Sequence, residues 1–291
     1  MAGAAPGCGG RGPRAVVSAP APRPTRCGVD LANFGPAGQP RALVELARAA
    51  EDAGWDGIFL WDHVARIEGD VEVTEPWVAL GAMASATTRV TLGPLVTPLA
   101  RRRPWNVARA AVTLDHLSGG RAVLGVGLGT IRGSEFTAFG EEADPRARGD
   151  LLDEALGLIQ NAWSGAPVNH AGHWRIDGVR FLPTPLKPRG IPLWAATESV
   201  RGRPVRRAAR LDGVFPIRIG RDEIPALVTA LVAARREQGL GELPADYDIV
   251  VDQGEQPGPW EEAGATWWVR TFPWDTPLRE VRRVVDAGPP R

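Results

Sequence analysis

From residue 28 to the end of the chain, short apolar runs alternate with longer segments whose apolar residues repeat at helical spacing. The short runs have the length of buried strands, and the longer segments present one apolar face. Residues 40–54, for example, place Leu43 and Leu46 on one side of a helix that ends at Gly54. This alternation is typical of parallel strands joined by crossover helices.

About eight strand and helix units can be counted, the number that closes a parallel barrel. The predicted strands cover residues 28–34, 57–61, 89–95, 122–127, 191–195, 213–217, 248–251 and 266–271. The predicted helices cover residues 40–54, 76–86, 104–117, 148–163, 205–210, 224–238 and 277–285, with a shortened seventh helix at 257–264. The predicted fold is a single α/β domain, a (β/α)₈ TIM barrel over residues 28–291. An open doubly wound sheet shows the same alternation, but no linker separates two halves of this chain.

The charge balance bears on the kind of partner. The 34 basic and 34 acidic side chains cancel, so no net charge attracts the chain to nucleic acid or to an anionic membrane. No apolar run is long enough to span a membrane or to serve as a secretory signal. We therefore expect a small-molecule partner, with no nucleic acid and no membrane, and leave a homodimer open.

The two cysteines, Cys8 and Cys27, form neither a disulfide framework nor a metal-binding pattern. Their scarcity fits a reducing compartment, so a cytoplasmic location is expected. Residues 1–27 are rich in glycine and proline, and we predict either a disordered N-terminal extension or a segment upstream of the true start codon.

The best candidate for acid–base chemistry is His63. In a closed barrel the active site lies at the carboxyl ends of the strands, and His63 follows the second predicted strand. Its imidazole titrates near neutrality, and the neighbouring Asp62 can orient it or bind a cofactor. The alternative is that the two side chains only cap a loop.

The other three histidines are weaker candidates. His116 lies on the last turn of a predicted helix, where the helix dipole favours a cation, so a capping role is preferred. His170 and His173 share a polar loop that offers no further ligand, and no metal site is predicted.

The fourth predicted strand ends in alternating glycines, Gly125, Gly127 and Gly129. The spacing departs from a dinucleotide fingerprint, which has a further glycine at its sixth position. Residues without bulky side chains would let a planar ring approach the strand end. The alternative is a tight turn that needs no ligand.

A phosphate site is a second candidate, because Ala195, Ala196 and Thr197 end the fifth predicted strand before a helix that begins with arginines and a proline. Free backbone N–H groups and arginines at a helix start can bind phosphate. An arginine-rich surface helix is the alternative.

Several of the 11 tryptophans lie near predicted strand ends. Trp61, Trp77 and Trp194 are placed to line an apolar pocket, whereas Trp267 and Trp268 are expected to pack the last strand.

Five segments resemble the bacterial luciferase-like superfamily, especially its deazaflavin-dependent branch, and they agree in order and spacing. They are ELARAAEDAGWDGIFLWDHV (45–64), TTRVTLGPLVTP (87–98), ARAAVTLDHLSGGRAVLGVGLG (108–129), RGDLLDEALGLIQNAWSG (148–165) and PTPLKPRGIPLWAA (183–196). The resemblance covers most of residues 28–220.

This resemblance implies a barrel that binds reduced FMN or coenzyme F420 and transfers a hydride at N5 of the flavin ring or its deaza equivalent, C5. It implies that Asp62 and Thr97 contact the cofactor, that Leu95 lies in a bulge supporting the ring, and that His63 serves the substrate or a transferred proton. The remaining residues expected at the cofactor are Gly127, Leu128, Gly129, Ala195, Ala196 and Thr197. Phe34 and Trp61 are expected beside the substrate.

Two positions depart from the family pattern. Ala196 and Thr197 stand where the family commonly has a glycine pair, which puts the phosphate geometry in question. Thr130 stands where the deazaflavin-dependent sugar-phosphate dehydrogenases have a glutamate base, so that substrate is not expected.

The functional hypothesis is a flavin- or deazaflavin-dependent oxidoreductase acting on an unknown small organic substrate. FMN would suit a monooxygenase, and F420 a dehydrogenase or reductase. One alternative is a non-catalytic flavin-binding barrel. Another is a sugar-phosphate enzyme without a redox cofactor, which is disfavoured because no lysine or paired carboxylates are seen at the predicted strand ends.

Overall fold

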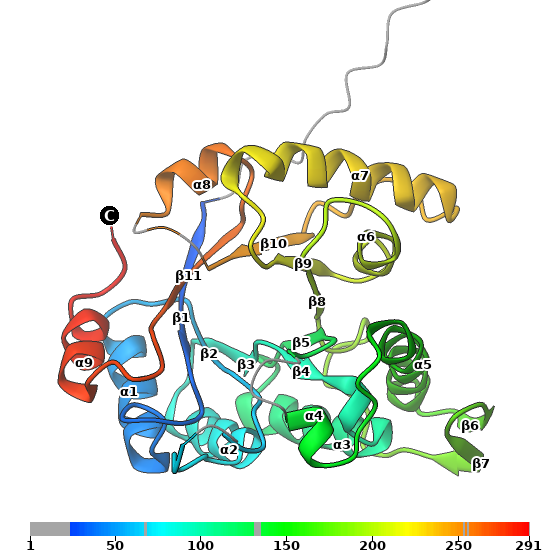
Figure 1. Cartoon of the computed structure of the whole chain (residues 1–291), viewed down its shortest axis with the longest axis horizontal. Helices are drawn as coiled ribbons and strands as arrows, with labels where there is room; N and C mark the ends of the chain where they lie inside the picture. Colours follow the sequence, from blue (N-terminus) through cyan, green and yellow to red (C-terminus); the bar gives the residue numbers. More distant parts are fainter. Residues whose placement is uncertain (1–23, 67–68, 131–134, 253, 255, 291) are drawn as a thin grey trace, which may run out of the picture.

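The structure is a computed structural model that describes residues 24–66, 69–130, 135–252, 254 and 256–290 (Figure 1). Most of the predicted extension over residues 1–27 therefore lies outside the described residues. Its last residues are described, and Arg26 and Cys27 already belong to the first strand, which begins two residues before the predicted start at Gly28.

Parallel strands form a barrel, which confirms the predicted TIM barrel and excludes the open doubly wound sheet (Figure 1). In chain order they are β1 (Arg26–Leu31), β2 (Gly57–Leu60), β3 (Thr91–Pro94), β4 (Thr97–Pro98), β5 (Leu124–Gly127), β8 (Leu193–Thr197), β9 (Gly213–Pro216), β10 (Asp248–Val251) and β11 (Trp267–Thr271). The sheet order is β3-β2-β1-β11-β10-β9-β8-β5-β4. A parallel bridge between Leu92 and Ala122 brings its two edges together.

The third barrel strand is interrupted. Its first part, β3, pairs with β2, and its second part, β4, pairs with β5. The break falls at Leu95 and Val96, which are joined by a cis peptide bond. It lies where the resemblance predicts a bulge.

Helices alternate with the barrel strands close to the predicted positions. They are α1 (Pro40–Asp52), α2 (Pro76–Ala86), α3 (Pro104–Ser118), α4 (Glu135–Ala138), α5 (Pro145–Trp163), α6 (Arg203–Ala208), α7 (Ile224–Glu237), α8 (Gly258–Glu262) and α9 (Leu278–Asp286), with short 3₁₀ turns η1 (Leu99–Arg101) and η2 (Arg221–Glu223). The first three of these helices begin with proline, whose fixed φ and missing N–H suit the first helical turn. None of the helices in the described part of the chain is long and apolar enough to cross a membrane.

One predicted loop is a hairpin instead. The segment around His170 and His173 forms the antiparallel strands β6 (Pro167–Ala171) and β7 (Arg175–Arg180), which lie outside the barrel (Figure 1). Polar residues dominate both strands, so the apolar alternation that marks a strand is too weak here to be recognised.

Large aromatic rings fill the barrel interior. Phe59, Trp194 and Trp267, together called the aromatic floor, pack with ring centres 5.6 to 5.7 Å apart. All three are buried. Trp194 was predicted to line a pocket and instead belongs to this interior, whereas Trp268 points outward into the larger core between barrel and helices.

Three glycines make room for the aromatic floor. A Cβ atom on Gly28 would lie 2.8 Å from the ring of Phe59, one on Gly57 would lie 2.9 Å from the ring of Trp267, and one on Gly213 would lie 2.5 Å from the ring of Trp194. Contacts this short do not occur, so each ring occupies the volume of a missing side chain. The interior below the strand ends is therefore closed by side chains, and a ligand has to bind at the rim.

Candidate active site

His63 lies just beyond β2 and is held by a carboxylate from another part of the chain. Its Nδ1 is 2.9 Å from Oε2 of Glu135, the first residue of α4. A carboxylate accepts hydrogen bonds, so in the neutral imidazole this contact places the ring hydrogen on Nδ1 and leaves Nε2 as an acceptor without a partner among the described residues. The imidazole is therefore oriented for proton exchange through Nε2.

The main chain on both sides of His63 is also fixed. Asn33 donates through Nδ2 to the carbonyl of His63 at 2.8 Å and accepts from its N–H at 3.2 Å. Oε1 of Glu135 accepts from the N–H groups of Val64 and Ala65 at 2.6 and 3.0 Å. These bonds fix the loop after β2 and thereby the position of the imidazole.

Two arginines connect Glu135 to Asp62. Arg101 donates to Oε2 of Glu135 at 2.8 Å and also to the backbone carbonyl of Asp62. Arg102 donates to Oδ1 of Asp62 at 2.5 Å, and the hydroxyl of Thr97 donates to Oδ2 at 2.9 Å. The result is a buried network in which two carboxylates are matched by two guanidinium groups.

Burial raises the pKa of Glu135, but its bonds to His63, Ala65 and Arg101 outweigh this, so the pKa falls from 4.5 to about 2. A carboxyl group whose pKa is lowered by folding stabilises the protein above its unfolded pKa, and this stabilisation is lost as the pH falls towards the folded value. The loop around His63 is thus weakened in acid between about pH 4.5 and pH 2.

We expect Glu135→Gln to remove this acid dependence. In urea unfolding followed from pH 7 to pH 3, the wild type should lose about 2 to 3 kcal/mol more than the variant across this range. Glu141→Gln, at an exposed position of the loop after α4, is the matched control and should follow the wild type. Equal acid sensitivity of Glu135→Gln and wild type would contradict the assignment.

A second carboxylate lies inside the barrel and was not predicted. Val29 and Leu31 pack in the outer core, so Asp30 between them points inward. Its Oδ2 accepts from Nε1 of Trp61 at 2.7 Å, whereas its buried Oδ1 has no hydrogen-bond partner within the described part of the chain. Burial raises the pKa of Asp30 well above its ordinary value, and the nearby charge of Asp252 adds to the effect.

Asp252 follows β10 and faces the same side of the barrel as Asp30. Burial raises its pKa from 3.8 to about 6. Together with Trp61 and His63, the two acids make the rim polar along β10, β11, β1 and β2.

The opposite half of the rim is apolar. Leu95 and Val96 at the interrupted strand, Ala196 on β8 and Ile217 after β9 pack on the interior cluster, and the last three remain partly exposed. The carboxyl ends of the strands therefore form a rim with a polar half and an apolar half.

The glycines after the fourth predicted strand are explained by contacts within the protein. A Cβ on Gly125 would lie 2.5 Å from the carbonyl oxygen of Pro94, and one on Gly127 would lie 2.9 Å from Val96. Gly129 has a φ of 72°, and its Cβ would lie 2.8 Å from Pro98. Close packing of β5 on the interrupted strand thus requires small residues even without a ligand.

The predicted phosphate turn is largely occupied by bonds within the chain. The hydroxyl of Thr197 donates to the carbonyl of Ser199 at 2.8 Å. Arg203, which opens α6, is paired with Asp150 and Asp153 at 2.5 and 2.7 Å. Ala195 points into the outer core, and only Ala196 faces the rim. These contacts favour the surface-helix interpretation of the arginines.

The neighbouring Leu128 and Gly129 are also engaged. Arg148 donates to the carbonyls of Leu128 and Gly129 at 3.0 and 3.2 Å, and so fixes the loop after β5. The histidines outside the rim have structural bonds: His116 contacts the carbonyl of Thr184 at 2.9 Å, and His170 contacts Glu154 at 2.8 Å. Among the described residues, no group of three or more His, Cys, Asp or Glu side chains could hold a metal ion.

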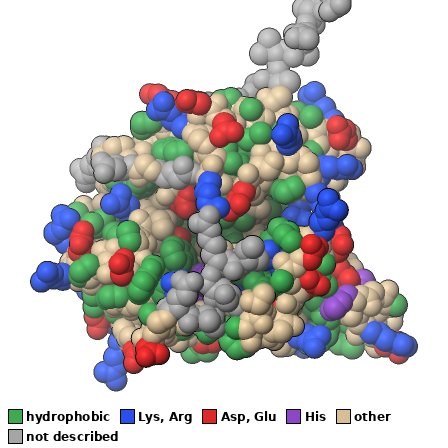
Figure 2. All heavy atoms as spheres, in the orientation of Figure 1, with side chains coloured by type: hydrophobic (Ala, Val, Ile, Leu, Met, Phe, Trp, Pro, Cys, Tyr) green, Lys and Arg blue, Asp and Glu red, His purple; other side chains and the backbone are tan. Residues whose placement is uncertain are grey.

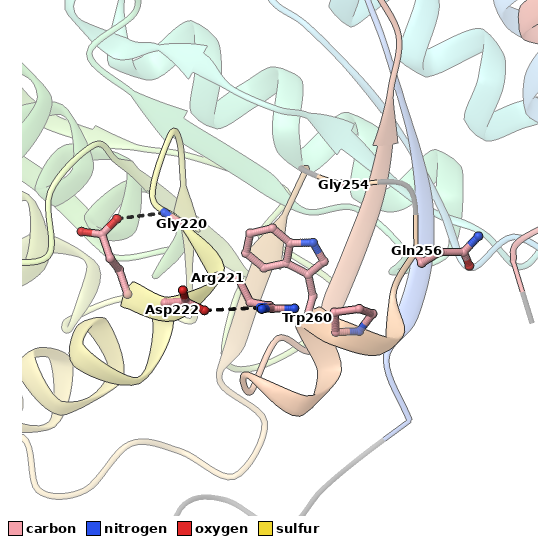
Figure 3. Close-up of a pocket in the computed structure, with 8 residues that line it drawn as sticks. Gly220, Arg221, Asp222, Gly254, Gln256 and Trp260 are labelled. Atoms are coloured by element: carbon pink, nitrogen blue, oxygen red, sulfur yellow. Dashed lines mark hydrogen bonds and ion pairs between the residues drawn. The ribbon is translucent and has the colours of Figure 1, made fainter.

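A pocket of about 550 Å³ lies between η2 and α8, away from the predicted residues (Figure 3). Trp260 lies between the segment from Gly220 to Asp222 and the segment near Gln256. Polar groups that line the pocket bond to one another: the N–H of Gly220 donates to Oε2 of Glu223 at 3.0 Å. No predicted site residue lines this pocket.

The sequence profile of the family described as luciferase-like monooxygenase matches residues 25–252, most of the chain. The chain belongs to this family. The five segments quoted above lie within the matched span, so the predicted resemblance is confirmed. Every barrel strand up to β10 and the whole network around His63 also fall inside it.

Two similar members of the luciferase-like family are enzymes named for F420. The F420-dependent hydroxymycolic acid dehydrogenase of Mycobacterium tuberculosis is 29% identical over 300 residues, covering 92% of this chain and 83% of that protein. The F420-dependent glucose-6-phosphate dehydrogenase of Nakamurella multipartita is 33% identical over 226 residues, covering 74% of this chain and 62% of that protein. These relatives support an oxidoreductase enzyme, and the non-catalytic alternative finds no support among them.

The fold is also found among solved structures. The coenzyme F420 dependent tetrahydromethanopterin reductase of Methanopyrus kandleri superposes with a TM-score of 0.72 at 16% identity, covering 91% of this chain and 98% of that chain. At this identity the likeness concerns the fold alone.

Proposed function

We propose that the protein is an F420-dependent oxidoreductase that moves a hydride between the deazaflavin ring and a small organic substrate. The observation that carries the proposal is the position of His63, held by Glu135 with Nε2 free, at a rim whose other half is apolar. The names of the relatives favour F420 over FMN, the other predicted cofactor.

The rim has the properties that a tricyclic redox ring needs. The partly exposed side chains of Val96, Ala196 and Ile217 offer one apolar wall for the face of a flat ring. The polar half supplies hydrogen-bonding groups, among them the unpartnered Oδ1 of Asp30. The residues present therefore fit a flavin or a deazaflavin.

When bound, the ring supplies the redox chemistry, as a hydride donor or acceptor. The chain's own residues hold and orient the reactants. Nε2 of His63 exchanges a proton with the substrate, while Glu135 keeps the imidazole in one tautomer and orientation. Asp62 and Thr97 bond to each other beneath this site, so we propose that they position the rim next to the cofactor.

For the remaining predicted residues we propose the following places around the cofactor and the substrate. Leu95 would lie under the ring, and Gly127, Leu128 and Gly129 at its edge, while the turn from Ala195 to Thr197 would carry the anionic tail. Phe34 and Trp61 would border the substrate. A reducing location such as the cytoplasm fits the buried free thiol of Cys27 and is part of the proposal.

The space-filling view agrees with a small-molecule partner. Acidic and basic side chains are interspersed over the face drawn in Figure 2, as expected for a chain with 34 of each. A nucleic-acid-binding surface would instead gather basic residues into one patch.

Titration of the purified protein with F420 and with FMN, followed by cofactor fluorescence, tests the proposal. We expect saturable binding of F420 at one molecule per chain. Ala196→Phe, which fills the apolar half of the rim, should weaken this binding about tenfold or more, equivalent to roughly 1.4 kcal/mol. Ala166→Phe, at an exposed loop position, is the matched control.

The outcomes separate the two cofactors. Binding of FMN alone would refute the choice of F420 but retain the flavin-type oxidoreductase. Binding of neither ligand, or equal affinity of the Ala196→Phe protein and the wild type, would show that the ring does not lie on the apolar half of the rim.

A further inference from the structure

Arg66 lies three residues after His63, at the edge of the polar half of the rim, and its charge lies against two aromatic rings. Its guanidinium carbon is 4.9 Å from the ring centre of Phe34 and 5.3 Å from that of Trp274. The same Phe34 ring meets the His63 imidazole edge-on, with centres 5.2 Å apart. The cation is thus separated from the candidate acid–base group by one aromatic ring.

The guanidinium of Arg66 has no counter-ion in the described part of the chain. It makes no hydrogen bond or ion pair there, and its Nε is buried without a partner. Arg101 and Arg102, by contrast, are bound by Glu135 and Asp62. A partly buried charge that no described residue pairs is open to an anionic ligand.

The backbone is shaped to bring these aromatic rings together. Gly35 has a φ of 76°, and a Cβ there would lie 2.3 Å from the carbonyl oxygen of Trp274. Only glycine allows this approach between the loops after β1 and β11. These strands pair with each other, and β1 also pairs with β2, the strand that precedes Arg66.

The geometry restricts what Arg66 can bind. The two ring centres are only 5.8 Å apart, so both rings lie to one side of the guanidinium, which leaves its terminal N–H groups for hydrogen bonding. These groups match the two oxygens of a carboxylate. Trp61 and Trp274 are partly exposed and supply apolar surface nearby, whereas Phe34, 5.8 Å from each indole between ring centres, is buried.

We propose that Arg66 and Trp274 form a binding site for an organic carboxylate, with its carboxyl group on Arg66 and its apolar body against the partly exposed indole of Trp274, while the buried ring of Phe34 supports the guanidinium from within. In so far as this acid is the substrate of the enzyme, the inference rests on the proposed function. The specificity of the enzyme would then be for organic acids rather than for neutral or cationic compounds.

The test uses the purified protein without cofactor, so it does not depend on redox activity. Benzoate and its uncharged counterpart benzamide are titrated separately, and tryptophan fluorescence is followed. Benzoate should bind at least about tenfold more tightly than benzamide, the magnitude expected of charge-assisted hydrogen bonds. Arg66→Gln should abolish the difference, and Arg66→Lys should restore only part of it because lysine lacks the planar fork.

Arg175→Gln, at an exposed position on β7, is the control and should bind benzoate as the wild type does. Failure of the wild type to prefer benzoate, or a preference that survives in Arg66→Gln, would overturn the proposal. The carboxylate on Arg66 can belong to the substrate or to the tail of the cofactor. To distinguish the two, binding of a deazaflavin is measured with and without its phosphate and glutamate tail. If Arg66→Gln weakens binding of the tailed form only, Arg66 serves the cofactor and the substrate assignment is wrong.

Discussion

Replacing His63 with alanine should lower turnover by about 10²- to 10⁴-fold, the usual contribution of a positioned general acid or base. The imidazole lies at the rim with Nδ1 bonded to Glu135, so its loss removes the group that exchanges a proton through Nε2. Binding of the cofactor should change little, because the apolar half of the rim is intact. The effect should therefore appear in kcat rather than in the Kd of the cofactor.

This expectation is measured with whichever substrate supports turnover in a screen, under both steady-state and single-turnover conditions. His116→Ala is the matched control, because that imidazole is exposed on the last turn of α3 and contacts the carbonyl of Thr184. Single-turnover hydride transfer at the wild-type rate in His63→Ala would falsify the acid–base role.

Removing the indole of Trp267 should destabilise the barrel by about 3 to 5 kcal/mol, as expected for truncating a fully buried aromatic residue to alanine. Trp267 contacts Phe59 and Trp194 in the aromatic floor, and Arg26 stacks on its ring at 4.3 Å. Because these neighbours are large and rigid, they cannot collapse into the space that the indole leaves.

The matched control is Trp267→Phe. The indole Nε1 of Trp267 is buried and has no hydrogen-bond partner among the residues that the structure describes, so phenylalanine removes this donor while it keeps most of the ring. This variant should lose less than about 1.5 kcal/mol. The free energy of unfolding in urea measures both. Equal losses would mean that packing of the floor does not set the stability.

The fold could be predicted from the sequence because it depends on local periodicity. Each barrel strand is a short apolar run, and each long helix has an apolar face, so the order of the elements was visible without knowledge of their contacts. The hairpin β6–β7 was missed because its strands are polar and stand outside the core. Nothing in their pattern distinguishes them from a loop.

The site could be predicted only where the chemistry directly follows a strand. His63 and Asp62 come immediately after β2, and barrel topology places such residues at the rim. Glu135 and Arg101 were missed because they follow their strands at a distance and reach His63 and Asp62 through tertiary contacts. No spacing rule connects positions 63 and 135.

Asp30 was missed for a different reason. It lies within an apolar run, and a single acidic residue does not change the prediction of a buried strand. Only the structure shows that it faces Trp61 and that one of its oxygens is unpartnered. Asp30 and Asp252 lie close enough for their charges to interact, so the prediction that no paired carboxylates occupy the strand ends is wrong.

The match between rings and glycines beneath the rim links positions that are far apart in the sequence. An extra methyl group at Gly213 would meet both Trp194 and the backbone of Asp248, and one at Gly57 would meet both Phe59 and Trp267. A substitution at either glycine therefore requires several neighbours to shift or change with it. We therefore expect substitutions in the barrel interior to accumulate slowly and together. The loops above the rim can change one residue at a time and so alter which substrate is bound.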